Sequence, residues 1–162
     1  EELHYAPQEA GRIMSIYGLG VLLSVAGGAL GDKFPLRPVL SGSFLAASLI
    51  GWLLFNGPVN FAAQASFAFA FGVVFSGAIY VNLAAFHVKA VNGTLSGRAS
   101  GLFVTSFYTA ASAAGYVIGW LAMNYGWTIA GDLQLGVACL GGAILSLALR
   151  PDRMAAREAV SS

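Results

Sequence analysis

Residues 28–37, with the sequence GALGDKFPLR, place the charged side chains of Asp32, Lys33 and Arg37 between two long apolar segments. Pro35 lies inside this stretch and Pro38 follows it, and proline disfavours the continuation of a helix through such a position. Charges and prolines between apolar segments are typical of a short connection at a membrane surface. The stretch therefore predicts a loop between two membrane-spanning helices.

The composition supports this interpretation. The chain has 162 residues, of which 57% are hydrophobic and only 9% are charged, whereas soluble domains carry about 25% charged residues. Its 21 glycines suit closely packed transmembrane helices. The net charge of +1 argues against a nucleic-acid partner, because such proteins carry a basic surface. Cys139 is the only cysteine, which excludes an internal disulfide and a cysteine metal cluster.

No glycine-rich loop followed by Lys and Ser or Thr is present to hold a nucleotide. The two histidines are too few for a zinc or catalytic site. We therefore expect no cofactor, no metal and no catalytic residues.

Five apolar segments follow one another along the chain, and each can cross a bilayer core of about 30 Å at about 1.5 Å per residue. We predict spans at residues 11–31, 39–56, 60–88, 98–123 and 128–149, followed by a tail at residues 150–162. The fold class is thus an all-α, polytopic transmembrane bundle with five spans. Soluble buried helices and a transmembrane barrel fit less well, because the segments are long, uncharged and without alternating polarity.

The basic residues predict the orientation. Seven of the eight Lys and Arg residues fall on one side of the predicted spans: Lys33, Arg37, Lys89, Arg98, Arg150, Arg153 and Arg157. By the positive-inside rule this side is cytoplasmic. The N-terminus is then external and the C-terminal tail cytoplasmic. The first residue is Glu1, not Met, so we expect a fragment or a processed chain.

The opening stretch resembles the signature loop of the major facilitator superfamily, in which a glycine, three residues, an aspartate and a basic residue precede a glycine and two basic residues. Gly28, Asp32, Lys33 and Arg37 match this pattern, whereas Pro35 and Leu36 depart from it. Such a copy is more usual between the eighth and ninth helices of these carriers, and residues 82–120 resemble the tenth to eleventh helices. The resemblance implies the last five helices of a twelve-helix carrier, in a bacterial inner membrane.

The resemblance also implies a gate. Asp32 ends one predicted span and Arg98 begins another on the same side, so an ion pair between them is allowed. We hypothesise that a gate set, comprising Gly28, Asp32, Lys33, Arg37 and Arg98, forms a latch that is made and broken during transport. The alternative is that these charges only end helices and fix the topology, because exposed ion pairs contribute about 0 to 1 kcal/mol.

Glycines four residues apart place two small positions on one helix face, which permits close helix crossings. Three such pairs occur: Gly27 with Gly31, Gly97 with Gly101, and Gly115 with Gly119. We predict that all three serve helix packing.

Polar residues inside membrane spans are costly in lipid and therefore mark candidate substrate contacts. Gln64, Phe71, Phe75, Ala78 and Asn82 recur along one face of the third span, and Thr105, Thr109, Ser112 and Tyr116 along one face of the fourth, with Tyr108 beside them. The candidate substrate-binding residues are Gln64, Phe71, Phe75, Asn82, Tyr108, Ser112 and Tyr116. Alternatively, the hydroxyls bond to their own helix carbonyls and the aromatic rings fill space between helices.

These features favour a secondary transporter that moves a small organic solute by alternating access of two helical bundles. Its partners would be membrane lipid, the solute and the missing N-terminal helices of the same carrier. The alternative from a different class is a five-span membrane scaffold or subunit that transports nothing.

Overall fold

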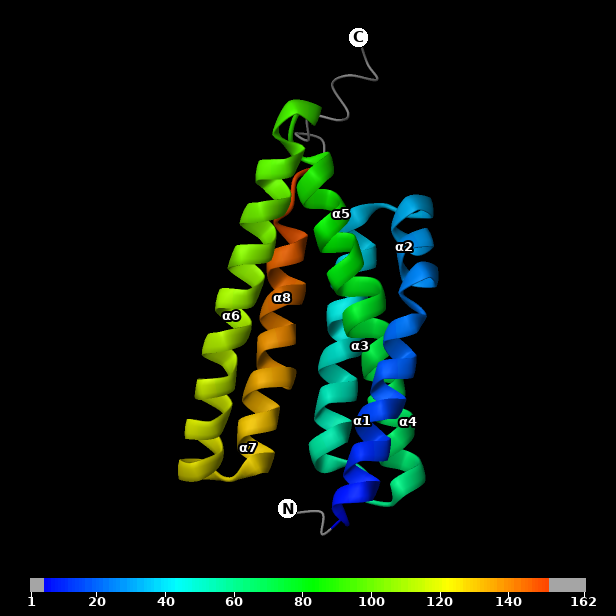
Figure 1. Ribbon diagram of the computed structural model, residues 1–162, viewed down its shortest axis with the longest axis vertical. Helices are drawn as coiled ribbons and strands as arrows, with labels where there is room; N and C mark the ends of the chain where they lie inside the picture. The colour runs from blue at the N-terminus through cyan, green and yellow to red at the C-terminus, as the bar shows by residue number, and fades with distance from the viewer. Residues whose placement is uncertain (1–4, 152–162) are drawn as a thin grey trace.

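A computed structural model describes residues 5–151, which form five long helical rods lying side by side (Figure 1). The first rod consists of α1 (Pro7–Leu22) and α2 (Ser24–Lys33), and the second is α3 (Leu36–Asn56). The third joins α4 (Phe61–Phe71), the π-helix η1 (Gly72–Tyr80) and α5 (Val81–Lys89). A 3₁₀ turn (Gly93–Leu95) leads into α6 (Ser96–Tyr125), and the fifth rod joins α7 (Trp127–Gly131), the π-helix η3 (Asp132–Val137) and α8 (Ala138–Leu147).

All five rods are long and apolar enough to cross a membrane, namely Pro7–Lys33, Leu36–Asn56, Phe61–Lys89, Gly93–Tyr125 and Trp127–Leu147. The prediction of an all-α bundle with five spans is confirmed. Of the predicted tail, only Arg150 and Pro151 belong to the described residues, so Arg153 and Arg157 lie outside them.

The rods begin and end at residues whose chemistry suits helix termini. Pro7 opens α1 and the carboxylate of Glu9 accepts a hydrogen bond from the Ala6 amide at 3.2 Å. Asn60 caps α4 by accepting a 2.9 Å hydrogen bond from the Ala63 amide. Gly126 separates α6 from α7 with a φ of 86°. Residues other than glycine rarely adopt this backbone conformation. The cap at Asn60 and the turn at Gly126 explain why the connections from α3 to α4 and from α6 to α7 are short.

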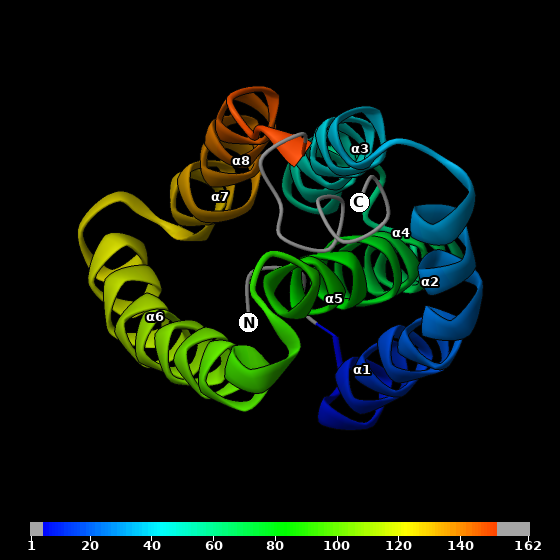
Figure 2. The ribbon, with the colours of Figure 1, turned by 90° about the horizontal axis from the view of Figure 1, so that it is seen from above.

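The third rod runs through the middle of the bundle. Seen from above, α5 lies near the centre, with α2 on one side of it and α6 on the other (Figure 2). The buried residues Ala47, Phe71, Ile79 and Cys139 form the core where α3, the third rod and α8 meet. The Ser41 and Ser146 hydroxyls bond at 2.7 Å between α3 and α8, so interhelical hydrogen bonds join the apolar contacts there.

Glycines bring the first and third rods into backbone contact. A Cβ atom added to Gly20 would overlap the Phe69 carbonyl, one on Gly27 would overlap Gly77, and one on Gly72 would overlap the Tyr17 carbonyl. At this crossing the two rods pack as closely as small residues permit.

The predicted glycine pairs differ in their surroundings. Gly27 and Gly31 both contact the third rod. By contrast, a Cβ atom added to Gly97, Gly101, Gly115 or Gly119 would meet nothing within 4 Å among the described residues. The proposed packing role therefore has a structural counterpart at Gly27 and Gly31, and within residues 5–151 the other two pairs contact no second helix.

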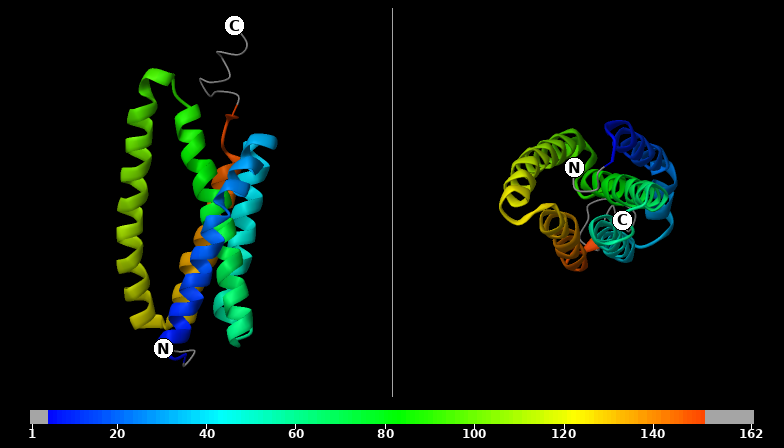
Figure 3. Two further views of the ribbon diagram at one scale, coloured as in Figure 1. Left: turned by 45° about the vertical axis from the view of Figure 1, so that its right-hand side comes forward. Right: turned by 90° about the horizontal axis from the view of Figure 1, so that it is seen from below.

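The fourth rod is the least covered. No residue of α6 is buried, and it meets α5 near one end and α7 at the other (Figure 3). The end of the bundle where α2 and α5 finish carries Lys33, Arg37, Lys89 and Arg98, and we call it the basic end.

Candidate gate and substrate groove

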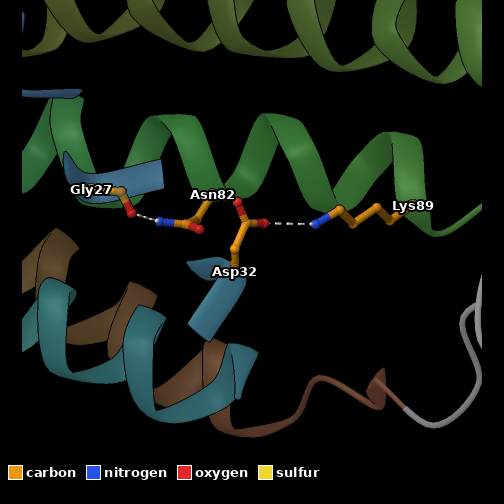
Figure 4. A network of polar contacts seen from close by, with 4 residues as sticks. All are labelled: Gly27, Asp32, Asn82 and Lys89. Carbon is orange, nitrogen blue, oxygen red and sulfur yellow. Dashed lines mark hydrogen bonds and ion pairs between the residues drawn. The ribbon is translucent and has the colours of Figure 1, made fainter. Parts of the chain in front are cut away.

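The loop at residues 28–37 is attached to the third rod through contacts between α2 and α5. Asn82 is only 2% exposed, and its amide nitrogen donates to the carbonyl of Gly27 at 3.0 Å (Figure 4). The same nitrogen donates to the carbonyl of Ala78 at 2.7 Å. The first bond crosses from the third rod to α2. A buried amide that bonds backbone carbonyls fixes the distance between two membrane helices.

Gly31 makes room for this amide. A Cβ atom added to Gly31 would overlap the side-chain oxygen of Asn82, and the nearest atoms it would meet all belong to Asn82. The glycine of the signature loop region and the polar residue of the third rod thus form one contact.

Asp32 makes an ion pair with Lys89, whose ammonium lies 3.2 Å from the carboxylate (Figure 4). Lys89 follows Asn82 by seven residues, which places both on the same face of α5, toward α2. We call Gly27, Gly31, Asp32, Asn82 and Lys89 the α2–α5 clamp. The side chains of Asp32 and Lys89 are 73% and 48% exposed, so this pair contributes at most about 1 kcal/mol.

The predicted partner of Asp32 was Arg98, and in this structure the carboxylate pairs with Lys89 instead. The reason is packing, because α2 contacts α5 whereas Arg98 is exposed in the first turn of α6. Among the described residues Arg98 has no ion-pair partner.

The remaining members of the gate set lie apart. A Cβ atom on Gly28 would lie 3.4 Å from the Val81 side chain, an ordinary contact. Lys33 is exposed in the last turn of α2. The Arg37 guanidinium donates to the carbonyl of Leu149, which links α3 to the residues after α8. Gly28, Asp32 and Arg37 thus contact three different partners, whereas Lys33 and Arg98 are exposed.

The polar face predicted on the third rod is used for packing in this structure. Gln64 is 4% exposed, and its amide nitrogen donates to the carbonyls of Leu54 at 3.2 Å and Pro58 at 3.1 Å. Phe71 is buried and stacks on Phe75 with ring centroids 5.3 Å apart. With Asn82 bonded to Gly27, these four candidate residues face neighbouring helices.

The polar face predicted on the fourth rod is open. Its residues form one open, shallow face of this single helix, which we call the α6 groove, lined by Thr105, Tyr108, Thr109, Ser112, Ala113 and Tyr116. Tyr108 and Tyr116 are 64% and 77% exposed. The structure therefore brings Tyr108, Ser112 and Tyr116 together on one surface with two threonine hydroxyls. Hydroxyls and aromatic rings of this kind can donate to, accept from and stack on an organic molecule.

Sequence reasoning missed the aromatic residues that hold this groove in place. Tyr80 of the third rod lies 4.9 Å from Phe107, centroid to centroid, and Phe107 lies 5.6 Å from Tyr108. Phe103 joins the same cluster at 5.7 Å from Tyr80. The spacing of Phe103 and Phe107 by four residues was the available signal, because it places both rings on one face of α6.

Gln134 supplies a second attachment. Its amide nitrogen donates to the Ala114 carbonyl of α6 at 3.1 Å, while its buried amide oxygen has no partner among the described residues. The face of α6 opposite the groove thus contacts the third rod through aromatic rings and the fifth rod through an amide. Within residues 5–151, no group of three His, Cys, Asp or Glu side chains could hold a metal ion.

Five long apolar helices, each able to cross a membrane, define an integral membrane protein. The family model of the Major Facilitator Superfamily matches residues 1–162. The chain belongs to this superfamily, whose members are membrane transporters. Comparison with curated proteins and with solved structures found no match.

Proposed function

We propose that this chain forms part of the C-terminal half of a secondary active carrier that moves a small organic solute across a bacterial inner membrane. The observation that carries the proposal is the α6 groove, where Tyr108, Ser112 and Tyr116 stand on a span without a buried residue. Polar side chains kept open at membrane depth are expected where they face water, solute or another part of the protein.

The transport mechanism would be alternating access, with this half rocking against a second helical bundle of the same carrier. The basic end would face the cytoplasm, because basic residues gather on that side of membrane proteins. The gate set would then act at the cytoplasmic side, with the Asp32–Lys89 pair as the contact present in this structure. The energy would come from an ion or solute gradient.

Thiol accessibility tests the proposal in the intact protein in membrane vesicles. In a cysteine-free background that includes Cys139→Ala, Ser112→Cys places a thiol in the groove, and Ser106→Cys places one on the same helix outside the groove lining. A membrane-impermeant maleimide should label Cys at 112 from either side, and transportable solute should slow that labelling. Position 106 should not respond to solute.

Absence of labelling at position 112 from both sides would contradict a water-accessible path. Solute-independent labelling at both positions would favour a non-transporting five-span scaffold.

A further inference from the structure

A second groove lies between α2 and α3, with η1 as its floor. Seen from above, α2 and α3 lie on the opposite side of the bundle from α6 (Figure 2). It has a volume of about 570 Å³ and an almost entirely apolar lining, represented by Leu23, Leu30, Phe34, Gly42, Ala46 and Val73. We call it the α2–α3 groove. Asp32, Lys89 and the residues of the α6 groove do not line it.

The groove exists because the first rod is interrupted and its neighbours are small. Leu23 separates α1 from α2, and its amide bonds to the Gly20 carbonyl at 3.1 Å, a tighter turn than the α-helical pattern. Across from α2, a Cβ atom added to Gly42 would meet nothing within 4 Å. The space between α2 and α3 is therefore left open by glycine and alanine.

The depth of the groove corresponds to one leaflet. It extends from Phe34, just beyond α2, to Leu23, eleven residues deeper along the rod, which spans about 16 Å at 1.5 Å per residue. Half of a bilayer core of about 30 Å has nearly the same thickness. An acyl chain that enters at the basic end would thus fit the length of the groove.

The mouth of the groove is basic. Lys33 directly precedes the lining residue Phe34 and is exposed, and the adjacent carboxylate of Asp32 is already paired with Lys89. A lysine at headgroup level attracts anionic lipid. Phe34, 57% exposed, is the lining residue next to Lys33 in the chain.

We propose that the α2–α3 groove is a binding site for an anionic phospholipid. One acyl chain lies in the groove between α2 and α3, and the headgroup phosphate is held by Lys33. The site faces away from α6, so the lipid is a structural or regulatory ligand and not the transported solute.

The test is native mass spectrometry of the delipidated intact protein, titrated with phosphatidylglycerol and, separately, with phosphatidylcholine. The wild-type protein should bind one phosphatidylglycerol about fivefold more tightly than phosphatidylcholine, the preference expected for one lysine near the surface. Gly42→Leu fills the groove and should weaken both lipids at least about tenfold, because each displaced methylene changes affinity about fourfold. Lys33→Gln should abolish only the headgroup preference.

Gly141→Leu is the matched control, because a Cβ atom at Gly141 also meets nothing within 4 Å and this glycine lies on α8, outside the groove lining. Thermal unfolding of each variant confirms that the protein remains folded. Unchanged lipid affinity in a folded Gly42→Leu protein overturns the proposal, as does equal affinity of the wild type for the two lipids. If Gly42→Leu instead dissociates a dimer without changing the lipid count, the groove seats a second copy and the proposal is wrong.

Discussion

The third and fourth rods have similar sequence patterns but different surroundings. Both carry polar and aromatic residues along one helix face, yet Gln64 and Asn82 of the third rod are 4% and 2% exposed while no residue of α6 is buried. The amides of the third rod donate to backbone carbonyls of other helices. The hydroxyls of the fourth face a groove. A polar face on a membrane helix can therefore serve packing or solute contact, and the neighbouring helix decides which.

The largest expected effect is a loss of stability when a side chain is introduced at the close contact between the first and third rods. In Gly27→Leu the new side chain would overlap Gly77 and separate the first and third rods, so we expect a loss of about 3 kcal/mol in the free energy of unfolding, at the upper end of the usual cost of overpacking. Denaturant unfolding in detergent measures it. Gly115→Leu on α6, where nothing lies within 4 Å, should be nearly neutral. Equal losses at the two sites would show that the two rods are equally packed.

The second prediction concerns the contact between Asn82 and Gly31. Asn82→Ala removes the bond to the Gly27 carbonyl, and Gly31→Ala introduces a methyl group where the Asn82 amide lies. Each single change should cost about 1 to 2 kcal/mol. The double variant should lose less than the sum by about 1 kcal/mol, because removing the amide makes room for the methyl group. Strict additivity in this double-mutant cycle would mean that the two residues do not touch.

The sequence was sufficient to predict the five helical rods, but it was insufficient to predict which residues of different rods contact one another. Length and hydropathy located five spans, because bilayer thickness imposes a minimum length on each apolar segment. The sequence could not identify the partner of Asp32, because Lys89 and Arg98 both lie at the basic end and only the packing of α2 on α5 selects Lys89. The glycine pairs show the same limit. Gly27 with Gly31 and Gly115 with Gly119 have the same spacing of four residues, but among the described residues a Cβ atom would meet another helix only at the first pair.

The third prediction sharpens the comparison from the side of the fourth rod. Tyr108→Phe and Ser112→Ala each remove one hydroxyl from the α6 groove, and a lost hydrogen bond of about 0.5 to 1.5 kcal/mol should raise the KM of uptake by about 2- to 10-fold. The measurement uses proteoliposomes and a solute identified with the wild-type protein. Ser106→Ala, on the same helix but outside the lining, is the matched control. A KM that changes equally at positions 106 and 112 would remove the groove from the transport path.

The smallest expected effect tests which helix holds the loop. Because the Asp32–Lys89 pair is exposed, a double-mutant cycle of Asp32→Asn with Lys89→Gln should give a coupling free energy below about 1 kcal/mol that decreases with added salt. The same cycle with Arg98→Gln should give no coupling, since Asp32 pairs with Lys89 in the described conformation. Coupling to Arg98 that exceeds coupling to Lys89 would mean that the loop contacts the fourth rod in a second, more populated conformation. The latch would then connect the packed third rod with the open fourth rod, and Asp32 would exchange partners between them during transport.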